Sequence, residues 1–212
     1  GLLAGITNIG IWRLEDNAES WRFVTDGFFP VGVARVGFSG ERLIAYSMKE
    51  DFVAMRGDRG GTWEQLPYAE DTRPGDMLVH QGAIVLGTSR GTRRTLDFGA
   101  SWDSASIGDG TRRVLALGAS GGRILAGCAG GAHAWSSASG SQWHAGISQD
   151  ISTWYSFAES VPGRIFAATA PDGLFASSDT GATWVRRDIP SVPGAVFDVA
   201  VSDGTVYTAS TR

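Results

Sequence analysis

The stretch Ser177–Trp184 has the sequence SSDTGATW and follows the pattern S-x-D-x-G-x-T-W. An Asp two residues before a Gly can accept hydrogen bonds from nearby backbone N–H groups, and the Gly supplies the positive φ of a tight turn. The Trp then begins the next strand and carries a large ring toward a neighbouring sheet. The pattern therefore predicts a motif that fixes a β-hairpin.

Weaker copies of this pattern recur along the whole chain. They are Leu14–Trp21, Arg56–Trp63, Thr95–Trp102 and Ser136–Trp143. The Trp residues lie at 21, 63, 102, 143 and 184, at intervals of 42, 39, 41 and 41 residues. In the first copy Ala18 replaces the Gly, and in the fourth Ala138 replaces the Asp. A period this regular predicts a repeat architecture.

Each repeat divides into four short apolar runs separated by turn residues. The first runs are expected near Val31–Phe38, Met77–Val79, Val114–Leu117, Tyr155–Ala158 and Val196–Val201. The second runs begin near Leu2, Leu43, Ile84, Ile124, Ile165 and Val206, at intervals of 41, 41, 40, 41 and 41 residues. Four-stranded units of this length predict an all-β fold, a β-propeller, with residues 1–212 as one domain.

The terminal repeats are incomplete, and they bear on the number of blades. The N-terminal segment supplies second, third and fourth strands, whereas the C-terminal segment supplies a first strand and a further second-type strand, Val206–Ser210. Pairing Val196–Val201 with the N-terminal strands closes a ring of five blades. We expect this closure because it hides edge strands. It leaves one second-type strand surplus. The alternative is a larger propeller that is cut or is completed by a second chain.

These motifs resemble those of the Asp-box, or BNR-repeat, propellers, which include sialidases, sortilin-type receptor domains, xyloglucan-degrading enzymes and a photosystem II assembly factor. The resemblance covers the whole chain. It implies that the boxes lie away from the ligand face and are structural. The residues concerned are Asp16, Asp58, Asp97 and Asp179 together with Trp21, Trp63, Trp102, Trp143 and Trp184. Sialidase chemistry is not expected, because Arg164-Ile165-Phe166 lacks the Pro of that family's Arg-Ile-Pro segment.

Composition restricts the partners. The chain has 18 Lys and Arg against 22 Asp and Glu, a net charge of -4, so no nucleic-acid partner is expected. No apolar stretch approaches the ~20 residues of a membrane span, and no membrane insertion is expected. The single cysteine, Cys128, follows an apolar run and is predicted to be a buried thiol. We expect a secreted or periplasmic protein, either monomeric or self-associating to complete the ring.

Ligand-binding residues are expected where the loops between fourth and first strands meet those between second and third strands. The candidates are Lys49, Glu50, Asp51, Arg90, Arg112, Trp154, Tyr155 and Asp172. Trp154 is expected to be exposed because it does not occupy the repeating Trp position, whereas Tyr155 has the alternative of packing between blades. The Arg residues have the alternative of pairing with neighbouring carboxylates.

A catalytic site is not assembled by any motif. A glycosidase needs two carboxylates that face each other across a cleft. Six acidic residues qualify by loop position alone: Glu50, Asp51, Asp71, Asp76, Asp150 and Asp172. The simpler interpretation is that they are solvated loop acids. His80, His133 and His144 lack zinc-site spacing, and neither a metal nor a cofactor is expected. The sequence favours a non-catalytic scaffold that binds a protein or glycan. The alternatives are a glycoside hydrolase or a fragment of one, and an excised or engineered set of blades.

Overall fold

The computed structural model describes residues 2–6, 10–14, 19–23, 33–47, 52–57, 61–67, 74–108, 112–137, 139–148, 150–189 and 194–210. Within these ranges every regular element is a β-strand except one short 3-10 turn, η2 (Ala129–Gly131). The prediction of an all-β chain is confirmed.

Four of the sheets have four antiparallel strands each, and we call them blades I to IV. Blade I comprises β4 (Val33–Ser39), β5 (Arg42–Ser47), β6 (Phe52–Gly57) and β7 (Glu64–Leu66). Blade II comprises β8 (Asp76–His80), β9 (Ala83–Thr88), β10 (Gly91–Thr95) and β11 (Asp103–Ala105). Blade III comprises β12 (Val114–Ser120), β13 (Arg123–Cys128), β14 (Ala132–Ser137) and β15 (Trp143–Ile147). Blade IV comprises β16 (Trp154–Val161), β17 (Arg164–Thr169), β18 (Gly173–Ser177) and β19 (Val185–Arg187).

Two smaller sheets lie at the ends of the described chain. The N-terminal sheet contains β1 (Leu2–Ile6), β2 (Gly10–Leu14) and β3 (Arg22–Phe23), and the C-terminal hairpin contains β20 (Val196–Ser202) and β21 (Thr205–Ser210). In every sheet each strand pairs with its neighbour in the chain, so the five sheets of three or four strands are antiparallel meanders and the sixth is a single hairpin.

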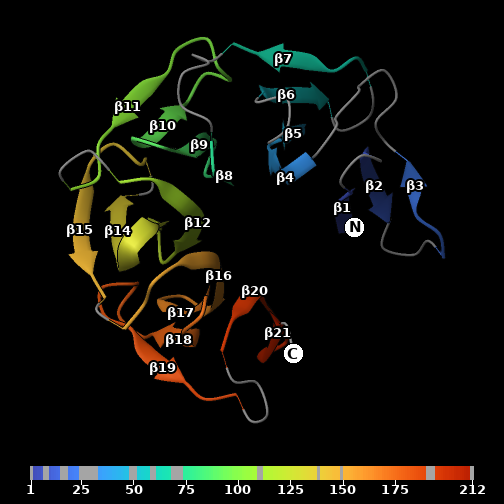
Figure 1. Cartoon of the computed structure of the whole chain (residues 1–212). Helices are drawn as coiled ribbons and strands as arrows, with labels where there is room; N and C mark the ends of the chain where they lie inside the picture. The colour runs from blue at the N-terminus through green and yellow to red at the C-terminus, as the bar shows by residue number, and fades with distance from the viewer. Residues whose placement is uncertain are drawn as a thin grey trace.

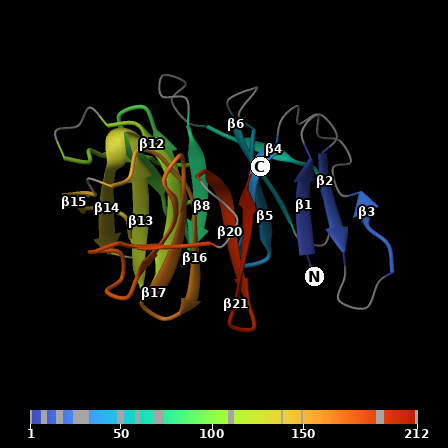
Figure 2. The ribbon, with the colours of Figure 1, turned by 60° about the horizontal axis from the view of Figure 1, so that its bottom comes forward.

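The sheets follow one another around an arc, with the first strand of each blade toward the centre and the fourth at the periphery (Figure 1). Successive innermost strands contact each other, from β4 to β8, β12, β16 and β20. The N-terminal sheet and the C-terminal hairpin form the two ends of this arc (Figures 1 and 2).

The hydrophobic core is divided among the interfaces between successive sheets. Between blades I and II, for example, Ile44 and Tyr46 pack with Met77 and Leu86, and between blades II and III Val85 packs with Val114. Further clusters join blade III to blade IV and blade IV to the C-terminal hairpin. The complete blades therefore bury apolar side chains against their neighbours, as the repeat pattern predicts.

Four of the five innermost strands share a local irregularity. β4, β12, β16 and β20 each carry a β-bulge next to their first residue, opposite the end of the second strand. A bulge places two residues opposite one and redirects their side chains. The bulged residues are Ala34, Leu115, Tyr155 and Phe197.

The C-terminal hairpin bears on the predicted closure of the ring. β20 pairs with β21, and among the described strands no register joins β20 to β1. The surplus second-type strand thus occupies the place that the five-blade scheme reserves for the N-terminal strands. The count of five blades remains a prediction.

Candidate functional site

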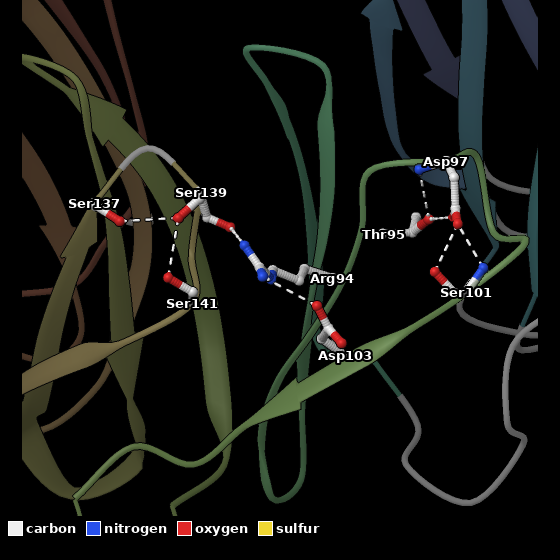
Figure 3. Close-up of polar contacts among 8 residues, drawn as sticks. All are labelled: Arg94, Thr95, Asp97, Ser101, Asp103, Ser137, Ser139 and Ser141. Atoms are coloured by element: carbon white, nitrogen blue, oxygen red, sulfur yellow. Dashed lines mark hydrogen bonds and ion pairs between the residues drawn. The ribbon is translucent and has the colours of Figure 1, made fainter.

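The two best copies of the repeated motif form the same hydrogen-bonded turn, which we call the box turn. In residues 95–102, Asp97 Oδ1 accepts from the Thr95 hydroxyl at 2.7 Å and the Ser101 N–H at 2.9 Å, while Oδ2 accepts from the Ser101 hydroxyl at 2.6 Å (Figure 3). Thr95 Oγ1 in turn accepts from Gly99 N–H at 2.8 Å. Gly99 has a φ of 88°, the positive value that the predicted tight turn requires of this glycine.

The turn around Asp179 repeats these contacts. Asp179 accepts from Ser177 Oγ at 2.7 Å, Thr183 N–H at 2.9 Å and Thr183 Oγ1 at 2.6 Å, and Gly181 has a φ of 86°. Asp97 and Asp179 satisfy backbone and hydroxyl donors inside their own turns. Both carboxylates are therefore committed to hydrogen bonds within their own turns.

Hydrogen bonding also changes the acidity of Asp97. Donation by Ser101 and Thr95 to the ionised form lowers the pKa of this carboxyl from 3.8 to about 2. The group is ionised throughout the neutral range and is held for hydrogen bonding, so the geometry gives it no proton-transfer role.

The fourth copy of the motif replaces the carboxylate contacts by a serine network. Ser139 Oγ lies 3.0 Å from Ser137 Oγ and 3.1 Å from Ser141 Oγ, and its carbonyl accepts from Arg94 of the preceding blade at 2.6 Å (Figure 3). Arg94 also pairs with Asp103 at 3.0 Å. Asp16 and Asp58, the Asp residues of the first two copies, lie outside the described residues.

The repeating Trp residues mark the interfaces between sheets. Trp63, Trp102, Trp143 and Trp184 are half-buried and pack in the core clusters, with the Trp102 indole N–H donating to the Pro67 carbonyl of the preceding blade. Trp21, on the N-terminal sheet, differs because 43% of its surface is exposed. Four of the five repeating tryptophans thus pack at the interfaces between sheets.

We call the end of the sheets that carries the predicted ligand loops the loop face. Lys49, Glu50 and Asp51 lie outside the described residues. Arg90 is exposed in the turn between β9 and β10, and Arg112 is half-buried just before β12. Asp172 is half-buried in the turn between β17 and β18, where its Oδ2 accepts from Ser152 N–H at 2.6 Å. Asp172 therefore joins two loops of blade IV.

The expectation that Trp154 is exposed is wrong. Its side chain is 0% exposed, and its ring lies 5.1 Å from that of Trp184 and 5.5 Å from that of Phe157. Trp154 begins an innermost strand at the position that Val114 holds in blade III. A Cβ on Gly127 would lie 2.2 Å from the Trp154 Cβ, so this glycine leaves the room in which the larger residue packs. The alignment of Trp154 with Val114 of the preceding repeat was the feature of the sequence that could have predicted its burial.

Tyr155 is exposed, and it has an aromatic neighbour that the sequence interpretation missed. Tyr155 is 39% exposed and Phe197 is 38% exposed, and their rings meet edge-to-face with centroids 5.1 Å apart. They are the bulged residues of β16 and β20, at matching positions 42 residues apart. That near-repeat spacing was the available signal for Phe197.

Asp76 is not a solvated loop acid, contrary to expectation. It is 2% exposed, and its carboxylate lies 2.5 Å from Arg35 Nε and accepts from Met77 N–H at 2.8 Å and Leu117 N–H at 2.7 Å. These contacts link β4, β8 and β12. Burial raises the pKa of Asp76, and the Arg35 charge and the backbone donors oppose that effect. The position at the start of an innermost strand explains the burial.

Other candidate chemistry is limited in the described part of the chain. Cys128 is buried, and desolvation raises the pKa of its thiol to about 12, which keeps it protonated. His133 is buried, with Nδ1 3.2 Å from Ser148 Oγ. Groups of three or more His, Cys, Asp or Glu side chains placed to hold a metal are absent from the described residues. None of the described helices has the length and apolar character needed to cross a membrane.

Comparison with protein-family models gives no match, and comparison with curated protein sequences gives none either. Comparison with solved structures does give matches. The extracellular domain of BT4673 from B. thetaiotaomicron superposes with a TM-score of 0.73 at 14% identity, over 98% of this chain and 30% of that one. An ancestral GH74 enzyme superposes with a TM-score of 0.67 at 16% identity, over 84% of this chain and 27% of the enzyme.

A third match is the computationally designed protein Ika8, with a TM-score of 0.59 at 11% identity over 83% of this chain and 54% of the design. The fold is a β-propeller. The predicted fold class is confirmed by the four-stranded meander blades and by these superpositions. At these identities the likeness concerns the propeller fold alone. The chain spans less than a third of the length of the BT4673 domain and of the GH74 enzyme.

Proposed function

We propose that this chain is an Asp-box propeller domain, spanning residues 1–212, that acts as a non-catalytic recognition scaffold for a protein or glycan. The observation that carries the proposal is the exposed ring pair of Tyr155 and Phe197 at the bulges of neighbouring innermost strands. Exposed aromatic side chains supply large contact area at low entropic cost, and they dominate the binding energy of many interfaces. We also propose a secreted or periplasmic location, in keeping with this class of propeller.

The box turns support the Asp-box assignment. The contacts of Asp97 and Asp179 are the same in two blades, down to the order of the hydroxyl and N–H donors. A carboxylate that is committed to its own turn stabilises the scaffold and leaves ligand contacts to other residues.

A single asymmetric site fits the loop face better than a ring of equivalent sites. Blade IV and the C-terminal hairpin carry aromatic residues at the bulge, whereas blade III carries Leu115 and blade I carries Ala34. Arg90 and Arg112 add positive charge to the loops of the preceding blades. The proposed site therefore centres on Tyr155 and Phe197.

The described carboxylates favour recognition over glycoside hydrolysis. Asp76 is buried in contacts that join three strands, and Asp172 accepts a backbone N–H of a neighbouring loop. Carboxylates held in this way serve the scaffold. A hydrolase needs two carboxyl groups facing a substrate, about 5–5.5 or 6.5–9.5 Å apart.

Ligand selection on the intact chain tests the proposal. A glycan array and a random peptide display library are screened, and the ligand obtained is titrated against Tyr155→Ala and Phe197→Ala. Each substitution is expected to weaken binding about tenfold or more, because a central aromatic anchor is lost. Leu96→Ala is the matched control, since Leu96 is 58% exposed and lies in a box turn. The Leu96→Ala variant is expected to bind the selected ligand with the same affinity as the parent chain.

Two results would contradict the proposal. The first is equal binding by the parent and both aromatic variants, which would move the site away from the bulges. The second is turnover of chromogenic glycosides that is lost in Asp172→Asn, which would make the chain a hydrolase.

A further inference from the structure

An arginine contacts the box turn of the next blade at every junction between complete blades. Arg42 of blade I lies over the Phe98 ring at 4.2 Å, and Arg123 of blade III donates to Thr180 Oγ1 at 2.5 Å. Between blades II and III, Arg94 donates to the Ser139 carbonyl at 2.6 Å. Phe98, Ser139 and Thr180 all occupy the fourth place of the box pattern.

Arg164 holds the same place in blade IV as Arg42 in blade I and Arg123 in blade III. All three are the first residues of the second strand, in β17, β5 and β13. Arg164 is exposed, and its guanidinium lies over Phe166 of its own strand at 5.6 Å. Within the described part of the chain no box turn contacts it. Arg164 of blade IV is thus equivalent to the arginines that contact a box turn at the other blade junctions, but it has no such contact within the described residues.

β21 shows a second uncovered surface, in the hairpin whose other strand, β20, contacts β16 and β17 of blade IV. It is a second-type strand, as are β5, β9, β13 and β17, whose residues are almost all buried because a third strand and a neighbouring blade cover them. In β21 five of six residues are exposed, including Tyr207 at 57%. Its paired neighbour among the described strands is β20 alone, and the hairpin stands as a separate two-stranded ribbon in Figure 2.

β21 also lacks the features that protect edge strands. Its sequence, Thr205-Val206-Tyr207-Thr208-Ala209-Ser210, contains no charged residue and no Pro, and it is rich in residues that favour strands. An uncharged, exposed edge of this kind is a template for a further strand.

We propose that the free edge of β21 and Arg164 together form a docking surface for the outer half of a blade. The occupant is a hairpin with a third strand, a box turn and a fourth strand. Its third strand pairs with β21, and the fourth residue of its box turn meets Arg164. The blade junctions already present specify this partner. In blades II, III and IV the third strand pairs with the second strand, and an arginine of the preceding blade contacts the fourth residue of the box turn. That arginine begins the second strand in blades I and III and lies on the third strand, β10, in blade II. The C-terminal hairpin is then the inner half of a blade that this occupant completes.

The probe is a synthetic peptide with the sequence of residues 173–187, which contains β18, the box turn and β19. Fluorescently labelled peptide is titrated into the intact chain, and amide exchange of Thr205–Ser210 is followed by mass spectrometry. Saturable binding and at least tenfold slower exchange in β21 are expected. A peptide of the same composition in scrambled order is the control, and it is expected neither to bind nor to protect β21.

Arg164→Ala is expected to weaken peptide binding about tenfold, because the contact with the turn is lost. Arg13→Ala, on the N-terminal sheet, is the matched arginine control and is expected to leave the affinity unchanged. To exclude failure by a peptide too weakly structured to bind, the same segment is fused to the C-terminus, which raises its effective concentration. The fused chain is expected to have a higher melting temperature than the parent, and Arg164→Ala is expected to reduce that gain.

Three results would overturn the proposal. One is a fused chain with unchanged melting temperature and unprotected β21. Another is binding that does not depend on Arg164. The third is slow amide exchange of β21 in the chain without peptide. If this protection does not depend on protein concentration, β21 pairs within the chain. If it rises with concentration, β21 pairs with a second copy.

Discussion

At the scale of single residues, the Asp of the box turn links the repeated motif to acid stability. Asp97 is ionised in the folded chain down to a pKa of about 2, against an ordinary value of 3.8. A carboxyl whose pKa is lower in the folded state stabilises the fold above its unfolded pKa. That contribution is lost as the pH falls from 3.8 to about 2, where the folded form also becomes protonated.

We therefore predict that Asp97→Asn lowers the melting temperature at neutral pH, and that the difference from the parent chain shrinks as the pH falls through this window. Thermal unfolding of both proteins from pH 7 to pH 2 measures the difference. Asp203→Asn, in the exposed turn between β20 and β21, is the control and is expected to follow the parent curve. A difference that stays constant down to pH 2 would contradict the prediction.

A short stretch of sequence carries enough information where a side chain acts within its own turn. The spacing of Asp97, Gly99 and Trp102 is enough to predict the turn, because all its donors and acceptors lie within eight residues. Trp154 shows the opposite case. Its burial depends on Gly127 in the preceding blade, and only a comparison across repeats connects the two.

At the scale of strands, Asp76 connects three innermost strands through one carboxylate. It lies opposite Gly87, the fifth residue of β9, and Asp198 lies at the matching position opposite Ala209 in β21. The two acids differ in their surroundings. Asp76 is buried with three partners, Arg35, Met77 and Leu117. Asp198 is exposed, and within the described ranges of the chain its one hydrogen-bond donor is Val199 N–H at 2.9 Å. This pair of equivalent positions offers an internal control.

We predict that Asp76→Ala lowers the free energy of unfolding by about 2–3 kcal/mol, because buried N–H donors on two strands and Arg35 lose a charged partner. Asp198→Ala is expected to cost about 1 kcal/mol or less, since one exposed hydrogen bond is lost. Urea unfolding of the two variants and the parent chain gives both values. Equal losses of unfolding free energy in the two variants would show that the contacts of Asp76 with β4 and β12 add nothing to its hydrogen bond with the next N–H of its own strand.

The order of the strands was predictable because period, turn residues and apolar runs all agree in each repeat. The bulges were not, since they follow from the pairing of first and second strands and leave no mark in one repeat alone. Phe197 was missed for this reason, although it lies one repeat after Tyr155.

At the scale of the whole molecule, the arc has interior and terminal sheets of unequal protection. β13 and β17 are flanked by strands on both sides and are buried, whereas β21 has one partner strand and is mostly exposed. In a repeat protein each unit is stabilised by its own contacts and by its nearest neighbours. The C-terminal hairpin contacts blade IV through β20, and among the described residues no sheet covers its other side.

We predict that amides of β21 exchange at least tenfold faster than those of β13 and β17 in the chain alone. Exchange through local opening reports how few contacts hold a segment, and the outward amides of an edge strand lack a backbone acceptor. Hydrogen exchange measured at two protein concentrations tests this, with β13 as the internal reference at the same position of its repeat. Equal protection of β21 and β13 at both concentrations would mean that the chain covers its own edge, and the ring would then be closed within one molecule. Protection that increases with concentration would mean that a second copy supplies the missing strand, so the functional unit would be an assembly and the aromatic site at Tyr155 and Phe197 would have to be mapped on it.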